Sequence, residues 1–512
     1  PFTISHLGLS GMKKIIIMSA MSILLGLSSC DDFLTTTPND APTRNVFWTT
    51  EADVAAGTNG MYWLFRDVIM TGEGERVLTY GDQPTGLWSN LSQINQSPSQ
   101  GNYQYTFTDT YFTDWSQYYK TLNVANVVIN SVPDIPWNEF DENQQNGIAE
   151  KNEYIGEALF VRAYVYFFMV RLWGEVPYVT TSVSDASETV RDIPMETEEN
   201  ILTNCLNDLK DAYDYLSWND THGLRASKAD RGAVQALRAH ILMWKNRKNK
   251  SVIDPQNYKD AIAAIDDIEQ SSKYDLQNMD NYLKIWNGGG KSIESIFEFP
   301  YSRGDGEKFS KNSIFSRFLG YPINTDRINE SVFKYEKSFL DIIDKYTANG
   351  DRRRTDCWER WGEEKFQYTK KYSSITYLDV DKLNWEMDNT FVLFRLSDMY
   401  LLRAEAHYEL QEYDLARAYL KKIHERAGIS DTVADNIPDD QLGTEICEER
   451  MRELYLEGHN LYDWVRNGQY AGRNGYTMNR YTQEGYLWPV NSTLIIDNQY
   501  VHQTPYWTDK MQ

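Results

Sequence analysis

The sequence predicts a mainly α-helical protein whose helices stack in pairs, with one long irregular region and a few short strands. Three observations support this class. One helix is apolar on every side, two later helices share a pattern of small and aliphatic residues, and only one short segment alternates as a strand does. At 512 residues the chain exceeds the roughly 250–300 residues of a usual single core, so it holds two domains or one large repeat-built body.

The central helix is expected over residues 154–173, because residues 163–170 are apolar or aromatic all round. Such a helix belongs in a protein core or in a membrane. The charges of Glu157, Arg162 and Arg171 exclude a span, which needs about 20 almost uncharged residues. Gly174 then stands where a left-handed helix cap is expected, so the helix ends there.

The N-terminus has the parts of a secretory signal peptide over residues 1–29, with residues 1–11 as an upstream extension. Lys13 and Lys14 supply the basic start, and an apolar run and small residues follow. The Leu-Ser-Ser-Cys sequence ending at Cys30 resembles a bacterial lipobox, in which the cysteine is lipidated; the alternative is an ordinary signal peptide with a chance cysteine. We therefore predict lipid attachment at Cys30, a tether over 30–42 and a folded body over 43–512.

The helical scaffold is predicted over residues 113–270 and 391–466. Residues 257–268 and 412–423 both place a Tyr ahead of spaced small and aliphatic residues, which is the second-helix pattern of tetratricopeptide repeats. Each is preceded by a segment that could pair with it, 227–245 and 391–410 respectively. Such pairs bury their apolar faces only by stacking on neighbours, so a solenoid-like bundle of tetratricopeptide-like helix pairs is expected. Further helices are expected at 43–71, 115–132, 199–216 and 444–466.

Two loop-rich regions, 72–112 and 271–390, lack a sustained period, apart from a short strand expected at 294–299. Loops beyond about 12–15 residues are usually functional or disordered. Their many aromatic residues argue against disorder. Tyr and Trp offer an apolar face with a polar tip, which suits sugar rings, although helical bodies also use them as packing. We expect these regions to face the ligand.

The net charge of −23 argues against nucleic acid as a partner, because binding phosphates needs a cationic face. It fits an uncharged ligand, or solubility alone. Cys205, Cys357 and Cys447 are odd in number and match no metal-site spacing, and Cys205 and Cys447 read as buried small hydrophobes. No cofactor and no metal site are predicted.

Several blocks of the sequence carry a family resemblance. Residues 156–167 read Gly-Glu-Ala-x-Phe-x-Arg-Ala-Tyr-x-Tyr-Phe, and residues 395–406 read Arg-x-x-Asp-x-x-Leu-x-x-Ala-Glu-Ala. With the Cys-Asp-Asp-Phe-Leu opening at 30–34 and the Glu-Gly-His block ending at 459, they resemble the SusD/RagB family of surface glycan-binding lipoproteins. One departure is Trp-Pro-Val-Asn at 488–491, where the family usually has Pro-Ile-Pro.

The resemblance implies a helical lid on a SusC-like TonB-dependent outer-membrane transporter, lipid-anchored and facing outside the cell. It would capture an oligo- or polysaccharide and deliver it to the channel without catalysis. No family motif matches in the ligand-facing regions, so the candidate glycan-binding residues come from composition alone. They are Trp88 and Tyr80 in the first region, and Trp286, Tyr301, Arg303, Trp358 and Trp361 in the second. The rings would stack on sugar C–H faces and Arg303 would donate to hydroxyls, the alternative for each being packing or transporter contact.

Two other functions stay open at this point. The sequence has no His-Glu-x-x-His, nucleophile elbow or phosphate loop, so we expect no enzyme. A glycoside hydrolase needs only two carboxylates about 5–9.5 Å apart, however, and 74 acidic residues leave that remote alternative open. The nearer alternative is a lipoprotein scaffold of helical repeats that binds peptides or proteins.

Overall fold

The computed structural model describes residues 48–71, 74–90, 110–182, 192–218, 226–287, 290–301, 309, 311, 313–325, 333–363, 366–473, 475–508 and 510. Residues 50–512 form one compact unit, and the fold below is the fold of that unit. The predicted signal peptide, the lipid attachment at Cys30, the tether and Arg303 lie outside the described residues. In the described part of the chain, no helix has both the length and the hydropathy needed to cross a membrane.

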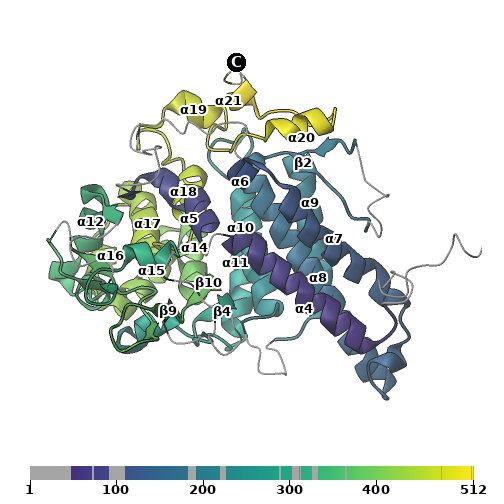
Figure 1. Cartoon of the computed structure of the whole chain (residues 1–512). Coiled ribbons are helices and arrows are strands. Elements are labelled where there is room, and N and C mark those ends of the chain that lie inside the picture. The colour runs from purple at the N-terminus through teal and green to yellow at the C-terminus, as the bar shows by residue number, and fades with distance from the viewer. Residues whose placement is uncertain are drawn as a thin grey trace, which may run out of the picture. The chain divides into compact units, whose positions relative to one another are not determined.

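The central helix α8 (Gln144–Trp173) organises the helical part of the unit (Figure 1). It begins well before residue 154 because Asn143 caps it, accepting hydrogen bonds from the backbone N–H groups of Gln145 and Asn146. Residues 163–170 are all buried, which confirms the core prediction. The helix ends at Gly174, whose φ of 74° suits glycine.

The described part of the chain contains further α-helices before and after α8. In chain order they are α4 (Glu51–Met70), α5 (Glu75–Gly81), α6 (Thr110–Thr113), α7 (Ser116–Ser131), α9 (Glu198–Tyr215), α10 (Arg231–Lys245) and α11 (Pro255–Gln270), followed by α12 (Lys337–Asp344), α13 (Arg353–Cys357), α14 (Leu396–Glu409), α15 (Tyr413–Ala427), α16 (Thr432–Asp435), α17 (Asp439–Glu453), α18 (Asn460–Arg466), α19 (Met478–Thr482), α20 (Ser492–Asp497) and α21 (Pro505–Thr508). α7, α8 and α9 pack side by side, and α10–α11 and α14–α15 form the two expected pairs. The predominance of paired helices confirms the predicted fold class.

The strands are short and pair two by two, always antiparallel. The pairs are β1 (Trp88–Asn90) with β5 (Phe333–Tyr335), β2 (Val176–Pro177) with β3 (Met195–Glu196), β4 (Ser295–Pro300) with β10 (Thr390–Arg395), β6 (Trp358–Glu359) with β7 (Tyr368–Thr369), and β8 (Ile375–Tyr377) with β9 (Trp385–Met387). β4 confirms the strand expected at 294–299. The region 72–112 is not loop throughout, because α5 and β1 lie in it.

Two predicted helices are interrupted. The segment 391–410 begins as strand β10, and α14 starts only at Leu396, because β10 is buried along its length and pairs with β4. The segment 444–466 is divided between α17 and α18. Leu456 (φ 59°) and Gly458 (φ 79°) take left-handed backbone conformations there, which a right-handed helix cannot contain.

Buried ion pairs join the irregular region to the C-terminal helices. Arg395, at the end of β10, pairs with Glu294 (2.7 Å), Glu453 (2.5 Å) and Glu457 (2.9 Å), and all four side chains are at most 1% exposed. Arg353 pairs with Glu453 from the other side at 3.0 Å. Each charge therefore has opposite charges around it, as burial requires.

Glu445, Glu449 and Arg452 of α17 belong to the same buried system. A sequence reading of their spacing predicts surface pairs worth about 0.2–0.5 kcal/mol. That prediction is wrong, since the three side chains are at most 6% exposed and Arg452 pairs with both glutamates. Charged residues of α17 lie on the face that packs inward. The charge of these residues therefore does not predict that they lie on the surface.

Candidate functional site

Four of the predicted glycan-binding rings are core residues. Tyr80, Trp88, Trp286 and Trp358 are between 1% and 3% exposed. In this structure they cannot stack on a ligand, so their assignment to an exposed platform is corrected. The physical reason is that the irregular region offers few aliphatic helix faces, and its aromatic side chains supply the core instead.

The rings pack on one another. Trp88 contacts Phe318 and Phe333, with ring centroids 5.0 and 4.7 Å away. Trp358 meets the ring of Tyr335 edge-on at 4.6 Å. The hydroxyl of Tyr80 donates to the carbonyl oxygen of Phe112 at 2.8 Å. The many aromatic residues of this region therefore serve mainly to pack its core.

Tyr301 and Trp361 are half-buried and keep part of their rings accessible. Trp361 meets Trp358 edge-on, with ring centroids 5.4 Å apart. The guanidinium of Arg354 lies 5.3 Å from the centroid of the Trp361 ring. Tyr301 stacks on Phe309 at 4.0 Å. These two residues stay candidates for ligand contact.

The structure adds Trp63, which is 53% exposed. It lies on α4 opposite the face that buries Val54, Met61 and Phe65. Arg66 is one helical turn further on, with its guanidinium 5.3 Å from the ring of Tyr301. Trp63, Arg66 and Tyr301 are called the α4 strip below. A sequence signal exists for Trp63, since a Trp out of phase with the apolar face of an amphipathic helix is expected to be exposed.

A concave site lies elsewhere on the unit, where the end of α8 meets the start of α9, the end of α10 and the C-terminal segment. Its volume is about 540 Å³. That is within the range of about 300–1,000 Å³ typical of small-molecule sites. We call it the polar pocket. Sequence patterns did not point to it, because its walls come from four segments far apart in the chain.

An ion network forms the floor of the polar pocket. Arg247 binds both carboxylate oxygens of Glu198, at 2.5 and 2.6 Å, and Lys250 bridges Glu198 (2.9 Å) and Glu484 (3.0 Å). Burial alone would raise the pKa of Glu198, but Arg247 and Lys250 lower it to about 2. Glu198 is therefore ionised at neutral pH.

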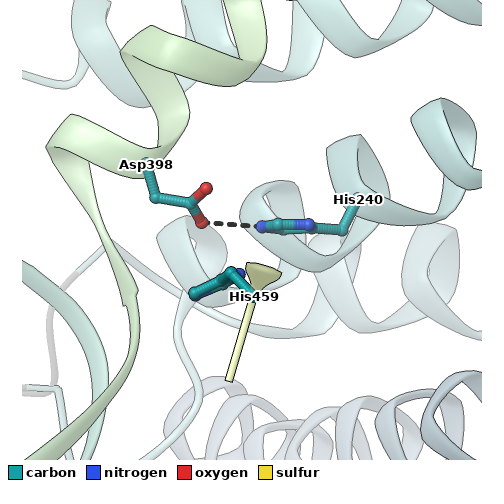
Figure 2. A group of neighbouring side chains, drawn as sticks. All are labelled: His240, Asp398 and His459. Carbon is teal, nitrogen blue, oxygen red and sulfur yellow. Dashed lines mark hydrogen bonds and ion pairs between the residues drawn. The ribbon is translucent and has the colours of Figure 1, made fainter. Parts of the chain in front are cut away.

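One buried cluster, His240, Asp398 and His459, has the residue types of a metal site, with ligand atoms within 4.8 Å of one another (Figure 2). Asp398 is already engaged, since one carboxylate oxygen bonds His240 Nε2 at 2.7 Å and the other accepts from Arg450 at 2.8 Å. The adjacent guanidinium also repels a cation. The arrangement is explained as a structural link between α10, α14 and α17.

Two family models match the chain. The model of the SusD family matches residues 266–507, and a model described as "Starch-binding associating with outer membrane" matches residues 32–243. A SusD-like protein of Formosa agariphila is 25% identical, with 96% of this chain and 99% of the relative covered. A SusD-like protein of Bacteroides ovatus is 24% identical, over 89% of this chain and 82% of the relative.

Solved structures share the fold. A SusD homolog from Bacteroides thetaiotaomicron superposes with a TM-score of 0.74 at 23% identity, covering 90% of this chain and 99% of its own. NanU of Bacteroides fragilis gives a TM-score of 0.69 at 19% identity, covering 92% and 99%. The two family models together match residues 32–243 and 266–507, which is most of the folded body. The solved structures agree with the helical architecture described above. The chain belongs to the SusD/RagB family.

Proposed function

We propose that the protein binds an oligo- or polysaccharide at the outer membrane and delivers it, without catalysis, to a partner SusC-like TonB-dependent transporter. The family supports carbohydrate as the ligand class. Within this chain, the observation that carries the proposal is the α4 strip. The exposed indole of Trp63 lies one helical turn before Arg66, and the guanidinium of Arg66 lies over the ring of Tyr301.

The strip has the chemistry that a sugar needs. A pyranose ring presents an apolar C–H face that stacks on an indole, and each ~60 Å² of apolar surface covered contributes about 1.5 kcal/mol. The guanidinium of Arg66 has five N–H donors in a fixed fork, which suit vicinal hydroxyl oxygens. A net charge of −23 disfavours polyanionic ligands, so a neutral glycan is the expected cargo.

Binding without hydrolysis is supported by the state of the carboxyl groups. A glycosidase needs one protonated carboxylic acid beside an ionised partner. Burial raises the pKa of both Asp82 and Glu157 to about 7, but neither lines the polar pocket or belongs to the α4 strip. Asp82 instead accepts hydrogen bonds from the backbone N–H groups of Gly458 and Asn460. Glu198, which does line the pocket, is held ionised and is no general acid.

Contact with the transporter is assigned to the hairpin of β8 and β9. Its tip exposes Leu378 (45%), Val380 (98%) and Leu383 (59%), and clustered exposed apolar side chains mark protein contact surfaces. Co-purification of the native complex tests this. Replacing Leu378 and Val380 by Ser should release the barrel protein, and retention of the barrel by this variant would place the contact elsewhere.

Anchoring through Cys30 and exposure outside the cell are part of the same proposal. Protease added to intact cells should cleave the protein, and Cys30→Ser should release it from the membrane fraction. Protection of the wild-type protein in intact cells would favour a periplasm-facing peptide-binding scaffold instead.

Glycan binding is tested with a glycan array followed by calorimetry on the best ligand. Trp63→Ala should weaken binding by about tenfold, because losing ~1.4 kcal/mol changes affinity by that factor. Tyr500→Ala removes another exposed ring, 48% exposed and outside the strip, and should leave affinity unchanged. Equal affinities of Trp63→Ala and the wild type would exclude the α4 strip as the binding site.

A further inference from the structure

The polar pocket has features of a ligand site in its own right. Its lining contains four glutamates, three basic side chains and one histidine, namely Glu175, Glu198, Glu199, Glu484, Lys245, Arg247, Lys250 and His502. The elements around it, β2, α9 and α21, lie near the C-terminus at the top of Figure 1, whereas β4, which leads into Tyr301, lies at the bottom. The pocket is therefore separate from the α4 strip.

Most charges in the pocket are neutralised locally. Arg247 and Lys250 neutralise Glu198 and Glu484, and Lys245 pairs with Glu199 at 2.5 Å. Glu175 has no Lys or Arg partner among the described residues, and His502 lies 3.7 Å from it. A ligand carrying a full charge would have to break one of these pairs or remain unpaired beside them. Either outcome makes a charged ligand less favourable in this pocket than a neutral one.

Hydrogen-bonding capacity remains although most of the charge is neutralised. Among the described residues, the Oε2 atoms of Glu199 and Glu484 accept no hydrogen bond. The Lys245 ammonium donates only to Glu199, and an ammonium has three donors. Carboxylate acceptors and an ammonium with spare donors thus line the same pocket. Vicinal hydroxyls, each of which donates and accepts, match such a combination.

The pocket also has apolar lining residues. Val252 is 75% exposed, and Met195 and Pro505 line the same cavity. An exposed valine beside a charged cluster is left in water unless something covers it. A sugar ring meets both demands, because its C–H face is apolar and its edge carries hydroxyls.

We propose that the polar pocket is a second saccharide site, which takes one neutral monosaccharide or the terminal unit of a longer glycan. The inference shares its ligand class with the proposed function, but it uses none of the residues of the α4 strip. A second site would let the protein hold a chain end while the strip holds another part of the glycan, or hold a second chain.

The test measures binding of glucose, galactose and mannose, each alone at millimolar concentration, to the purified protein by saturation-transfer NMR and calorimetry. Ser251 is an exposed lining residue that makes none of the ion pairs, so Ser251→Trp should block the pocket and weaken binding at least about tenfold. Ser338→Trp on α12 is the matched control, since Ser338 is also exposed but does not line the pocket. Glu199→Gln, at a side chain 69% exposed, should weaken binding severalfold without unfolding the protein.

The outcomes separate the two sites. Trp63→Ala should weaken binding of the long glycan about tenfold and keep monosaccharide binding, whereas Ser251→Trp should weaken monosaccharide binding. The pocket proposal fails if none of the three sugars binds, if Ser251→Trp binds as the wild type does, or if glucuronate binds more tightly than glucose. The proposed function fails separately, if no glycan of any length binds the wild-type protein.

Discussion

At the scale of single residues, exposure decides what an aromatic side chain does in this protein. Trp88 and Trp63 are the same residue type. Trp88 lies in the region 72–112 that the sequence predicts to face the ligand, and Trp63 lies on α4 before that region. Trp88 is 3% exposed and packs between Phe318 and Phe333, whereas Trp63 is 53% exposed. Only the ring of Trp63 is in contact with water that a ligand could displace.

Asp82 gives a prediction about pH. Burial raises its pKa to about 7 from an ordinary value of 3.8, although the backbone N–H groups of Gly458 and Asn460 oppose the shift. Between these values the folded protein holds a proton that the unfolded chain has released. The free energy of unfolding should therefore fall as pH rises from about 4 to about 7, by at most about 1.4 kcal/mol per pH unit for this group.

Urea unfolding of the wild type and of Asp82→Asn across this pH range measures the effect. The variant is neutral at every pH, so its unfolding free energy should fall less steeply with pH. Part of the slope remains, because the pKa of Glu157 is also raised to about 7 by burial. Parallel pH profiles for the two proteins would show that Asp82 titrates normally in the fold.

At the scale of elements, close helix contact depends on small residues. Gly156 of α8 faces α9, and a Cβ there would lie 2.8 Å from Leu216 Cγ and 3.2 Å from Tyr215 Cβ. Gly60 of α4 has nothing within 4 Å of the same position. The two glycines are both helical, but only one of them serves packing.

Alanine at each glycine should have opposite effects on stability. Gly60→Ala should raise the free energy of unfolding by up to about 1 kcal/mol, because alanine loses less backbone entropy in a helix. Gly156→Ala should lower it, since overpacking costs about 1–3 kcal/mol. Chemical denaturation of both variants measures the two changes, and a gain in stability at Gly156 would mean that α8 and α9 separate easily.

At the scale of the whole folded unit, buried charges connect the irregular region to the helical scaffold. Glu453 of α17 pairs with Arg395 (2.5 Å), Arg353 (3.0 Å) and Arg426. These partners come from β10, α13 and α15, so one carboxylate links three elements.

Glu453→Gln should lower the free energy of unfolding by about 3–5 kcal/mol, because it leaves buried guanidinium charges without their partner. Asp341→Asn is the control. Asp341 pairs with Lys337 at 2.6 Å, but the two side chains are 62% and 85% exposed, and such a pair contributes at most about 0.5 kcal/mol. Denaturant titration measures both, and a small effect at Glu453 would mean that water reaches the network.

The sequence by itself determined the helical class, the buried central helix with its end at Gly174, the two tetratricopeptide-like pairs and the family. These follow from periodicity and capping, which act between residues a few positions apart. The wrong helix start at residue 391 has the same origin, because the buried run of β10 has no period that separates strand from helix.

Only the tertiary structure decided which rings are exposed, that the charges of α17 point inward, and that four distant segments enclose the polar pocket. Burial and ion pairing depend on segments that meet after folding, as Arg247 and Glu484 do across more than two hundred residues. No local pattern predicts such long-range contacts. The candidate residues chosen from composition were therefore of a suitable residue type, but most of them are buried.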